Sequence, residues 1–273
     1  MVTHISKRVD VLVERHFINL AYLGAPFHGW QIQPNAVSVQ EVVEGALSTL
    51  FRTKIAIVGA GRTDAGVNAR MMIAHLDLEP AELTPILARS LNTIVGPDIA
   101  IYSITEVPDG SHARFDATER TYRYFVNHVK TPFFHTLSWF SPRLLDYDRM
   151  NEAATSLLEV HDFTSFAKLH SDAKTNICDV RKAVWTPIDT PDATFWQFEI
   201  SADRFLRNMV RAIVGTLVDV GRGKLSIDGF REIVATKNRC AAGTSMPGHA
   251  LYLWDVKYPY YHPPKVETSG FFS

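Results

Sequence analysis

The segment from Gly59 to Ala69 combines a permissive backbone with a pair of side chains that can act chemically. Its three glycines allow backbone dihedrals that other residues resist, and they let another molecule approach the main chain closely. Arg62 and Asp64 are two positions apart, so in an extended segment their side chains point to the same side. The guanidinium then favours the ionised carboxylate. The segment therefore predicts an anionic nucleophile or charge stabiliser at Asp64, rather than a proton-holding acid.

Two other interpretations fit part of this segment. A glycine-rich turn with an Arg–Asp pair is often only a surface hairpin. The run from Ile55 to Gly61 also resembles the first strand and turn of a dinucleotide-binding unit. That fingerprint needs a third glycine where Asp64 stands, followed by a helix. The residues up to Leu78 instead alternate like a strand, so a nucleotide-dependent oxidoreductase is the weaker hypothesis.

The elements around this loop predict an α+β protein. Strands are expected at 15–23, 54–58, up to 78 and 99–107, with one helix over 39–50 and another starting at Thr84–Pro85. Ser38 and Glu41 form a capping box at the start of the first helix. The resulting order, β-α-β-β-α-β, is that of a ferredoxin-like unit.

The same order returns after the turn at 108–111. Strands are expected at 119–128, 179–188, 194–201 and 251–258, with helices at 148–159 and 203–220 and a further helix capped by Ser226. We therefore predict an N-terminal domain at 1–110 that carries the Asp64 loop, a C-terminal domain at 111–261, and a loose tail at 262–273. The simplest assembly is one continuous antiparallel sheet, with helices on one face and the active cleft on the other.

Two further stretches hold candidate site residues. Arg204, Arg207 and Arg211 recur at helical spacing, which most often marks a solvated edge; alternatively, one guanidinium reaches the cleft and pairs with phosphate or with Asp64. Tyr122 lies on a predicted strand, where a tyrosine either packs with its hydroxyl at a rim or stacks on a base.

Composition limits the classes of function. The 273 residues have a net charge of −1, so a basic surface for nucleic acid must be a local patch. No apolar run approaches the roughly 18 residues of a membrane span, and Met1 to Arg15 has no signal-peptide core. The two cysteines form neither a disulfide framework nor a zinc spacing, and no histidine or acidic cluster along the sequence indicates a metal. A cytoplasmic protein without metal is expected.

Several motifs, in their order and spacing, resemble one known family: the tRNA pseudouridine synthase A family. The resemblance covers about Phe17 to Pro259 and rests on Phe27-His28-Gly29-Trp30-Gln31, Val39-Gln40, Gly61 to Val67, His112-Ala113-Arg114-Phe115, Arg120 to Tyr124, His161-Asp162-Phe163, Phe205 to Arg211 and Leu251-Tyr252-Leu253. It implies the pseudouridine synthase fold and isomerisation of uridine to pseudouridine at positions 38, 39 and 40 of tRNA. It also implies a homodimer that binds tRNA across both subunits, with no metal and no organic cofactor.

The resemblance also implies roles for five residues. Asp64 matches the catalytic aspartate, Arg211 the arginine that pairs with it, and Tyr122 the tyrosine that stacks on the target base and can take a proton. In the same way, Leu251 matches the leucine that walls the uracil pocket. Arg62 matches an arginine that helps to displace the target base.

Three positions depart from the family pattern. Leu23 replaces an acidic residue, Ile32 an arginine and Asn68 a histidine. Asn68 puts the hydrogen bonding of the loop in question, and Ile32 a contact with RNA. The alternative from another class is a non-catalytic tRNA-binding module on the same fold, which would bind tRNA without converting any base.

Overall fold

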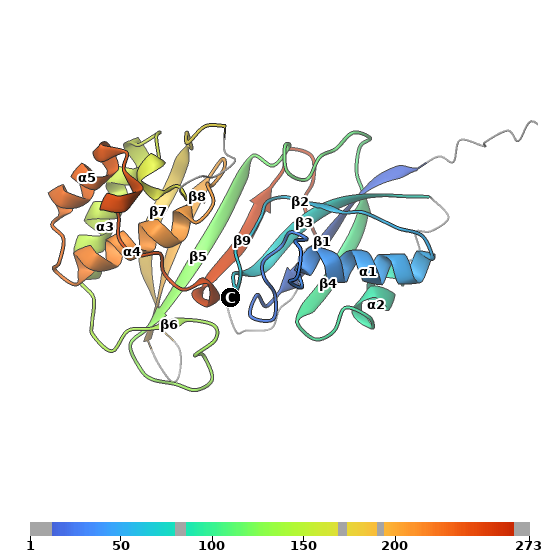
Figure 1. The fold of residues 1–273 in the computed structure, drawn as a ribbon, viewed down its shortest axis with the longest axis horizontal. Coiled ribbons are helices and arrows are strands. Elements are labelled where there is room, and N and C mark those ends of the chain that lie inside the picture. The colour runs from blue at the N-terminus through green and yellow to red at the C-terminus, as the bar shows by residue number, and fades with distance from the viewer. Residues whose placement is uncertain (1–12, 80–85, 169–173, 190–193, 265–273) are drawn as a thin grey trace, which may run out of the picture.

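The computed structural model describes residues 13–79, 86–168, 174–189 and 194–264, which form one long sheet carrying two groups of helices (Figure 1). The strands are β1 (Glu14–Tyr22), β2 (Val58–Gly59), β3 (Asn68–Leu78), β4 (Ile99–Glu106), β5 (Glu119–Asn127), β6 (Trp139–Phe140), β7 (Val180–Asp189), β8 (Thr194–Ala202) and β9 (Leu251–Lys257). The α-helices are α1 (Val39–Phe51), α2 (Leu87–Asn92), α3 (Tyr147–Thr155), α4 (Met209–Gly221) and α5 (Ile227–Thr236). The predicted α+β class is confirmed.

The two halves of the sheet have the same strand order. The main path is β4-β1-β3-β9-β5-β8-β7, with β2 beside β3 and β6 beside β5. When the strands of each half are counted in chain order, their order across the sheet is fourth, first, third, second in both halves: β4-β1-β3-β2 and β9-β5-β8-β7. This is the ferredoxin-like arrangement. The halves join where β9 lies parallel to β3, through Asn68↔Tyr252 and Ala69↔Leu253. The sheet is thus continuous but not wholly antiparallel. The direction of β9 is set by its antiparallel pairing with β5, and in that direction β9 runs parallel to β3.

Local sequence signals explain α1 and the shortness of β2. The Ser38 hydroxyl accepts from the backbone of Glu41, whose side chain returns to the Ser38 backbone, so the predicted capping box is present. The strand predicted over 54–58 is mostly irregular. Side chains of α1 take its backbone groups instead: Gln40 donates to the Ile57 carbonyl, and the Ile57 amide donates to Glu44.

Helix α4 begins six residues later than the spacing predicts. Asn208 adopts a left-handed conformation with φ of 67° directly before Met209. Upstream, the Asp203 carboxylate accepts from the amides of Asp179 and Arg204 at 2.7 and 2.8 Å. Such a local side-chain bond competes with helix formation. Arg204 and Arg207 therefore lie on an irregular segment before the helix.

Two hydrophobic clusters fill the two halves. One is built mainly from β1, α1, β3, α2 and β4, the other from β5, β7, β8 and the helices α3 to α5. Leu253, Val256, Tyr258 and Tyr261 pack in the first cluster although they come from the end of the described chain. Division into domains at residue 110 stays a prediction, as does the tail at 262–273, of which 265–273 lies outside the described residues.

The start of α2 predicted at Thr84–Pro85 also lies outside the described residues. Among the helices that are described, none is long and apolar enough to cross a membrane.

Candidate active site

Two arginines of the second half flank the Asp64 carboxylate. Nη1 of Arg211 lies 3.5 Å from one carboxylate oxygen, and Nε of Arg207 lies 3.5 Å from the other. The Arg211 side chain is 22% exposed and donates through Nε to the Met246 carbonyl, whereas Arg207 is 63% exposed. Because screening by water weakens an exposed pair, Arg211 is the stronger and better oriented partner.

The loop that carries Asp64 is fixed against the first half of the sheet. The Thr63 hydroxyl forms a 2.8 Å hydrogen bond with the Tyr22 hydroxyl, and the Thr63 carbonyl accepts from the Trp30 amide at 3.2 Å. Gly29 adopts a φ of +93°, and a Cβ atom there would lie 2.4 Å from that same carbonyl. Only glycine fits this contact. The carboxylate next to Thr63 is therefore held by a rigid support.

Asn68, one of the departures from the family pattern, ties three segments together. Its Oδ1 accepts from the Gly24 amide and its Nδ2 donates to the His249 carbonyl, both at 2.7 Å. The side chain is buried, at 2% exposure. An asparagine thus supplies both a donor and an acceptor at this position. The hydrogen bonding that the sequence left open is satisfied.

Replacing Asn68 should destabilise the fold. In Asn68→Ala the buried Gly24 amide loses its partner, and we expect the free energy of unfolding to fall by about 1–3 kcal/mol, measured by urea titration. Ile32→Ala is the matched control because Ile32 is 45% exposed, and its effect should stay within roughly 0.5 kcal/mol. Equal stability of both variants with the natural protein would contradict the structural role of Asn68.

Tyr122 and Leu251 lie on the neighbouring strands β5 and β9. Tyr122 pairs with Leu253 across β5 and β9, and Tyr124 pairs with Leu251. The Tyr122 ring packs edge-on against Phe205, with 5.1 Å between ring centroids. Burial raises the pKa of Tyr122 to about 12, opposed by Arg120 and aided by the negative charge of Asp64. The Tyr122 hydroxyl is therefore protonated at neutral pH.

The site lies on the face of the sheet that α4 covers. Tyr124 alternates with Thr121 and Arg123 along β5 and packs in the same cluster as the buried side of α4. Thr121 and Arg123 face the other side, where they line a polar pocket with Glu199. The sequence placed the cleft opposite the helices, but α4 itself supplies Arg211. The helix-bearing face carries the site because only there can Arg211 meet Asp64.

The contacts of Arg62 and Arg120 were not predicted from the sequence. Arg62 is exposed, and no ion pair or hydrogen bond joins it to another residue of the described ranges, so Asp64 faces Arg207 and Arg211 instead. Arg120 was not singled out from the sequence. Its guanidinium donates to the carbonyls of Ala60 and Asp203 at 3.0 and 2.7 Å. It therefore links the start of the Asp64 loop to the segment before α4.

Comparison with known proteins assigns this arrangement to a family. Residues 153–259 match the model of the tRNA pseudouridine synthase family. A tRNA pseudouridine synthase A of Bacteroides thetaiotaomicron is 55% identical over 90% of this chain and 91% of its own length. The chain belongs to the tRNA pseudouridine synthase A family. A relative from Parabacteroides distasonis is 56% identical, covering 90% of this chain and 97% of its own length. One from Bacillus subtilis is 41% identical, covering 88% and 97%.

Family membership confirms the resemblance seen in the motifs. It supports an isomerase that acts on tRNA over a non-catalytic module on the same fold. The dinucleotide interpretation fails on geometry as well, because β3, rather than a helix, follows the glycine-rich loop.

Proposed function

We propose that this protein isomerises uridine to pseudouridine at positions 38, 39 and 40 in the anticodon stem and loop of tRNA, with Asp64 as the catalytic residue. The observation that carries the proposal is the Asp64 carboxylate held between Arg207 and Arg211. Family membership supports the reaction class. Asp64 and Arg211 come from opposite halves of the chain, 147 positions apart.

The product has the same composition as the uridine substrate. The bond between ribose C1′ and uracil N1 breaks, the base turns, and a bond forms between C1′ and C5. The proton on C5 leaves, and N1 gains one, so no other reactant is consumed. Asp64 serves as the nucleophile in this proposal: the bond that its carboxylate forms to the nucleoside breaks again before the product leaves, which regenerates the carboxylate. The Arg211 guanidinium keeps the carboxylate aimed at the nucleoside.

Tyr122 holds the detached uracil in this proposal. The ring can stack on the base while Leu251 forms the adjacent wall. A tyrosine accepts a proton only as phenolate, and burial raises the pKa of Tyr122 to about 12, so the protonated phenol is the form present at neutral pH. Stacking, rather than proton transfer, is therefore the main contribution that we assign to Tyr122.

This assignment predicts different results for two substitutions. Tyr122→Phe keeps the ring and should retain activity within about twofold, whereas Tyr122→Ala removes about 1–3 kcal/mol of stacking and should lose about 5- to 150-fold. The measurement is single-turnover pseudouridine formation from pH 6 to 9. The natural enzyme should show no titration of Tyr122 in that range. Equal losses in both variants would instead assign the hydroxyl a chemical role.

Binding must offset the disruption of the tRNA. A uridine in a stem reaches the site only after leaving the stack, which costs a few kcal/mol. Arg62 is an exposed residue of the Asp64 loop and is the side chain that we assign to displacing the base. A homodimer that binds one tRNA across both subunits would supply the remaining contacts, and affinity should fall as salt rises. We assign the activity to the cytoplasm and to an enzyme without metal or organic cofactor in its catalytic site.

The experiment is tritium release from unmodified tRNA that carries label at C5 of uridine, followed by mapping of the modified positions. Release with pseudouridine at positions 38 to 40 supports the proposal. Binding of tRNA without release would favour the non-catalytic module. Release with pseudouridine elsewhere would keep the reaction and overturn the assigned positions.

A further inference from the structure

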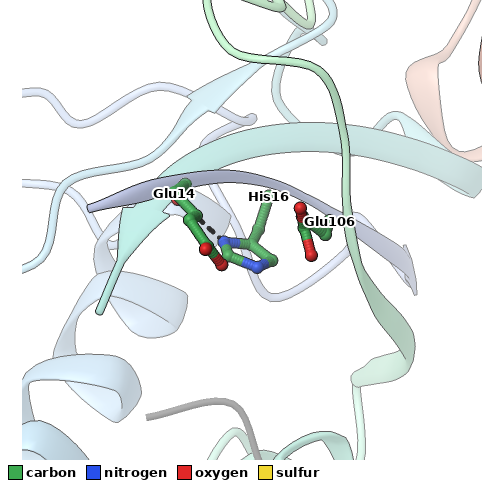
Figure 2. Close-up of side chains that lie close together, drawn as sticks. All are labelled: Glu14, His16 and Glu106. Atoms are coloured by element: carbon green, nitrogen blue, oxygen red, sulfur yellow. Dashed lines mark hydrogen bonds between the residues drawn. The ribbon is translucent and has the colours of Figure 1, made fainter. Parts of the chain in front are cut away.

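A second group of polar side chains lies at the edge of the first half of the sheet, and the function proposed above does not use it. Glu14 and His16 lie on β1, and Glu106 is the last residue of β4. One potential ligand atom from each lies within 4.8 Å of the other two. Figure 2 shows the His16 imidazole between the two glutamate side chains.

The register of the sheet fixes this grouping. His16 is the direct antiparallel partner of Glu106 across β1 and β4, and Glu14 is two residues from His16 on the same strand. Directly opposed side chains have Cβ atoms about 5 Å apart, and residues two apart on a strand share a face. The three side chains therefore lie close together because β1 and β4 pair in this register, and no long loop is needed to bring them together.

His16 points to a ligand that the protein itself does not supply. Its side chain is 0% exposed, and Nδ1 makes a 2.8 Å hydrogen bond with the backbone carbonyl of Glu14. The carbonyl can only accept, so Nδ1 is the donor in this bond, and Nε2 is the ring nitrogen left for another partner. Nε2 is buried and has no hydrogen-bond partner among the described residues. A histidine whose second nitrogen bonds a backbone carbonyl is the usual form of a metal-ligating histidine.

We propose that Glu14, His16 and Glu106 bind a divalent first-row cation of the Zn²⁺ class. Imidazole and carboxylate oxygens together suit such an ion, and three protein ligands leave a position for water. Tetrahedral bonds of about 2.1 Å require ligand atoms roughly 3.4 Å from one another. The carboxylates can close that gap, because Glu14 is half-buried and Glu106 is exposed, while His16 is fixed.

The surroundings of the two glutamates favour a cation. Glu14 and Glu106 line an open pocket together with Asp109, a third acidic residue, whereas the buried His16 lies outside the lining of that pocket. The bound ion would join β1 to the end of the edge strand β4 and would stabilise the fold, without taking part in the reaction at Asp64. The sequence predicted no metal, because Glu106 lies far along the chain from the Glu14-His16 pair and only the strand register unites them.

The test uses the full chain, stripped with chelator and titrated with Zn²⁺ by calorimetry. We expect one ion per chain for the natural protein and for Glu152→Gln, an exposed glutamate on α3 that serves as control. The double variant Glu14→Gln/Glu106→Gln should bind at least about 100-fold more weakly. These glutamates reach solvent, so the double variant should fold; an unfolding curve in chelator comparable with that of the natural protein verifies this.

A second readout separates this site from adventitious binding. Zn²⁺ should raise the urea midpoint of the natural protein and of Glu152→Gln, since an ion that binds only the folded state stabilises it. The midpoint of the folded double variant should not move. Absence of stoichiometric binding by the natural protein, or equal binding and equal stabilisation in the double variant, would overturn the proposal. Pseudouridine formation in chelator should be unchanged, so failure of either proposal can be recognised without the other.

Discussion

Asp64→Asn should reduce pseudouridine formation by at least about 10³-fold, because the amide removes the charged nucleophile while keeping the shape of the side chain. The Asp64 carboxylate is 21% exposed and forms ion pairs at 3.5 Å, so its removal should change stability little. We therefore expect folded protein that still binds tRNA. The measurement is tritium release from C5-labelled tRNA under single-turnover conditions.

Asp77→Asn is the matched control for this substitution. Asp77 lies on β3, is 48% exposed and pairs with Arg15 at the surface, so it shares the residue type and an arginine partner without facing the site. Its activity should stay within about twofold of the natural protein, because an exposed ion pair is worth at most about 1 kcal/mol. Full turnover by Asp64→Asn would remove Asp64 from the mechanism, whatever the control shows.

The second large effect should come from Arg211→Gln. Losing a preorganised charged group beside the reacting centre typically reduces kcat by about 10²–10³-fold, and Arg211 is both half-buried and held by the Met246 carbonyl. Arg207→Gln removes the same charge from the other side of Asp64, but this guanidinium is 63% exposed. Its loss should reduce kcat less than about tenfold.

Kinetics and binding separate the two arginines further. We expect Arg211→Gln to change kcat, and Arg207→Gln to act mainly on KM and on the salt dependence of tRNA binding, since an exposed guanidinium is available to phosphate. Comparable kcat losses in both variants would contradict the ranking by burial. Arg231→Gln, at an exposed position of α5 where the arginine pairs with Asp228, controls for the loss of one positive charge.

Much of this architecture is predictable from local sequence. The capping box at Ser38 and Glu41 marks the start of α1, and alternation along Glu119 to Asn127 predicts β5. The repeated order of elements also predicts the strand order of each half. These features depend on residues close in sequence, or on a repeated pattern that leaves few topologies open.

Other features depend on long-range contacts that sequence spacing does not encode. The spacing of Arg204, Arg207 and Arg211 predicted one helical face, but left-handed Asn208 delays α4, and Arg207 reaches Asp64 from a loop. Proximity along the chain likewise suggested Arg62 as the partner of Asp64. The observed partners come from the second half instead, because tertiary packing, rather than sequence neighbours, surrounds the carboxylate.

The position of β9 has a consequence for how the molecule can fold. This strand pairs with both β3 and β5, and residues 253 to 261 fill the cluster built largely from residues 17–117. The earlier half thus cannot bury all of its apolar surface until a segment more than a hundred residues later arrives. Contacts this distant slow folding, because the loop must close before they are gained. Assembly of the sheet is therefore a joint event, in which neither half reaches its final form alone.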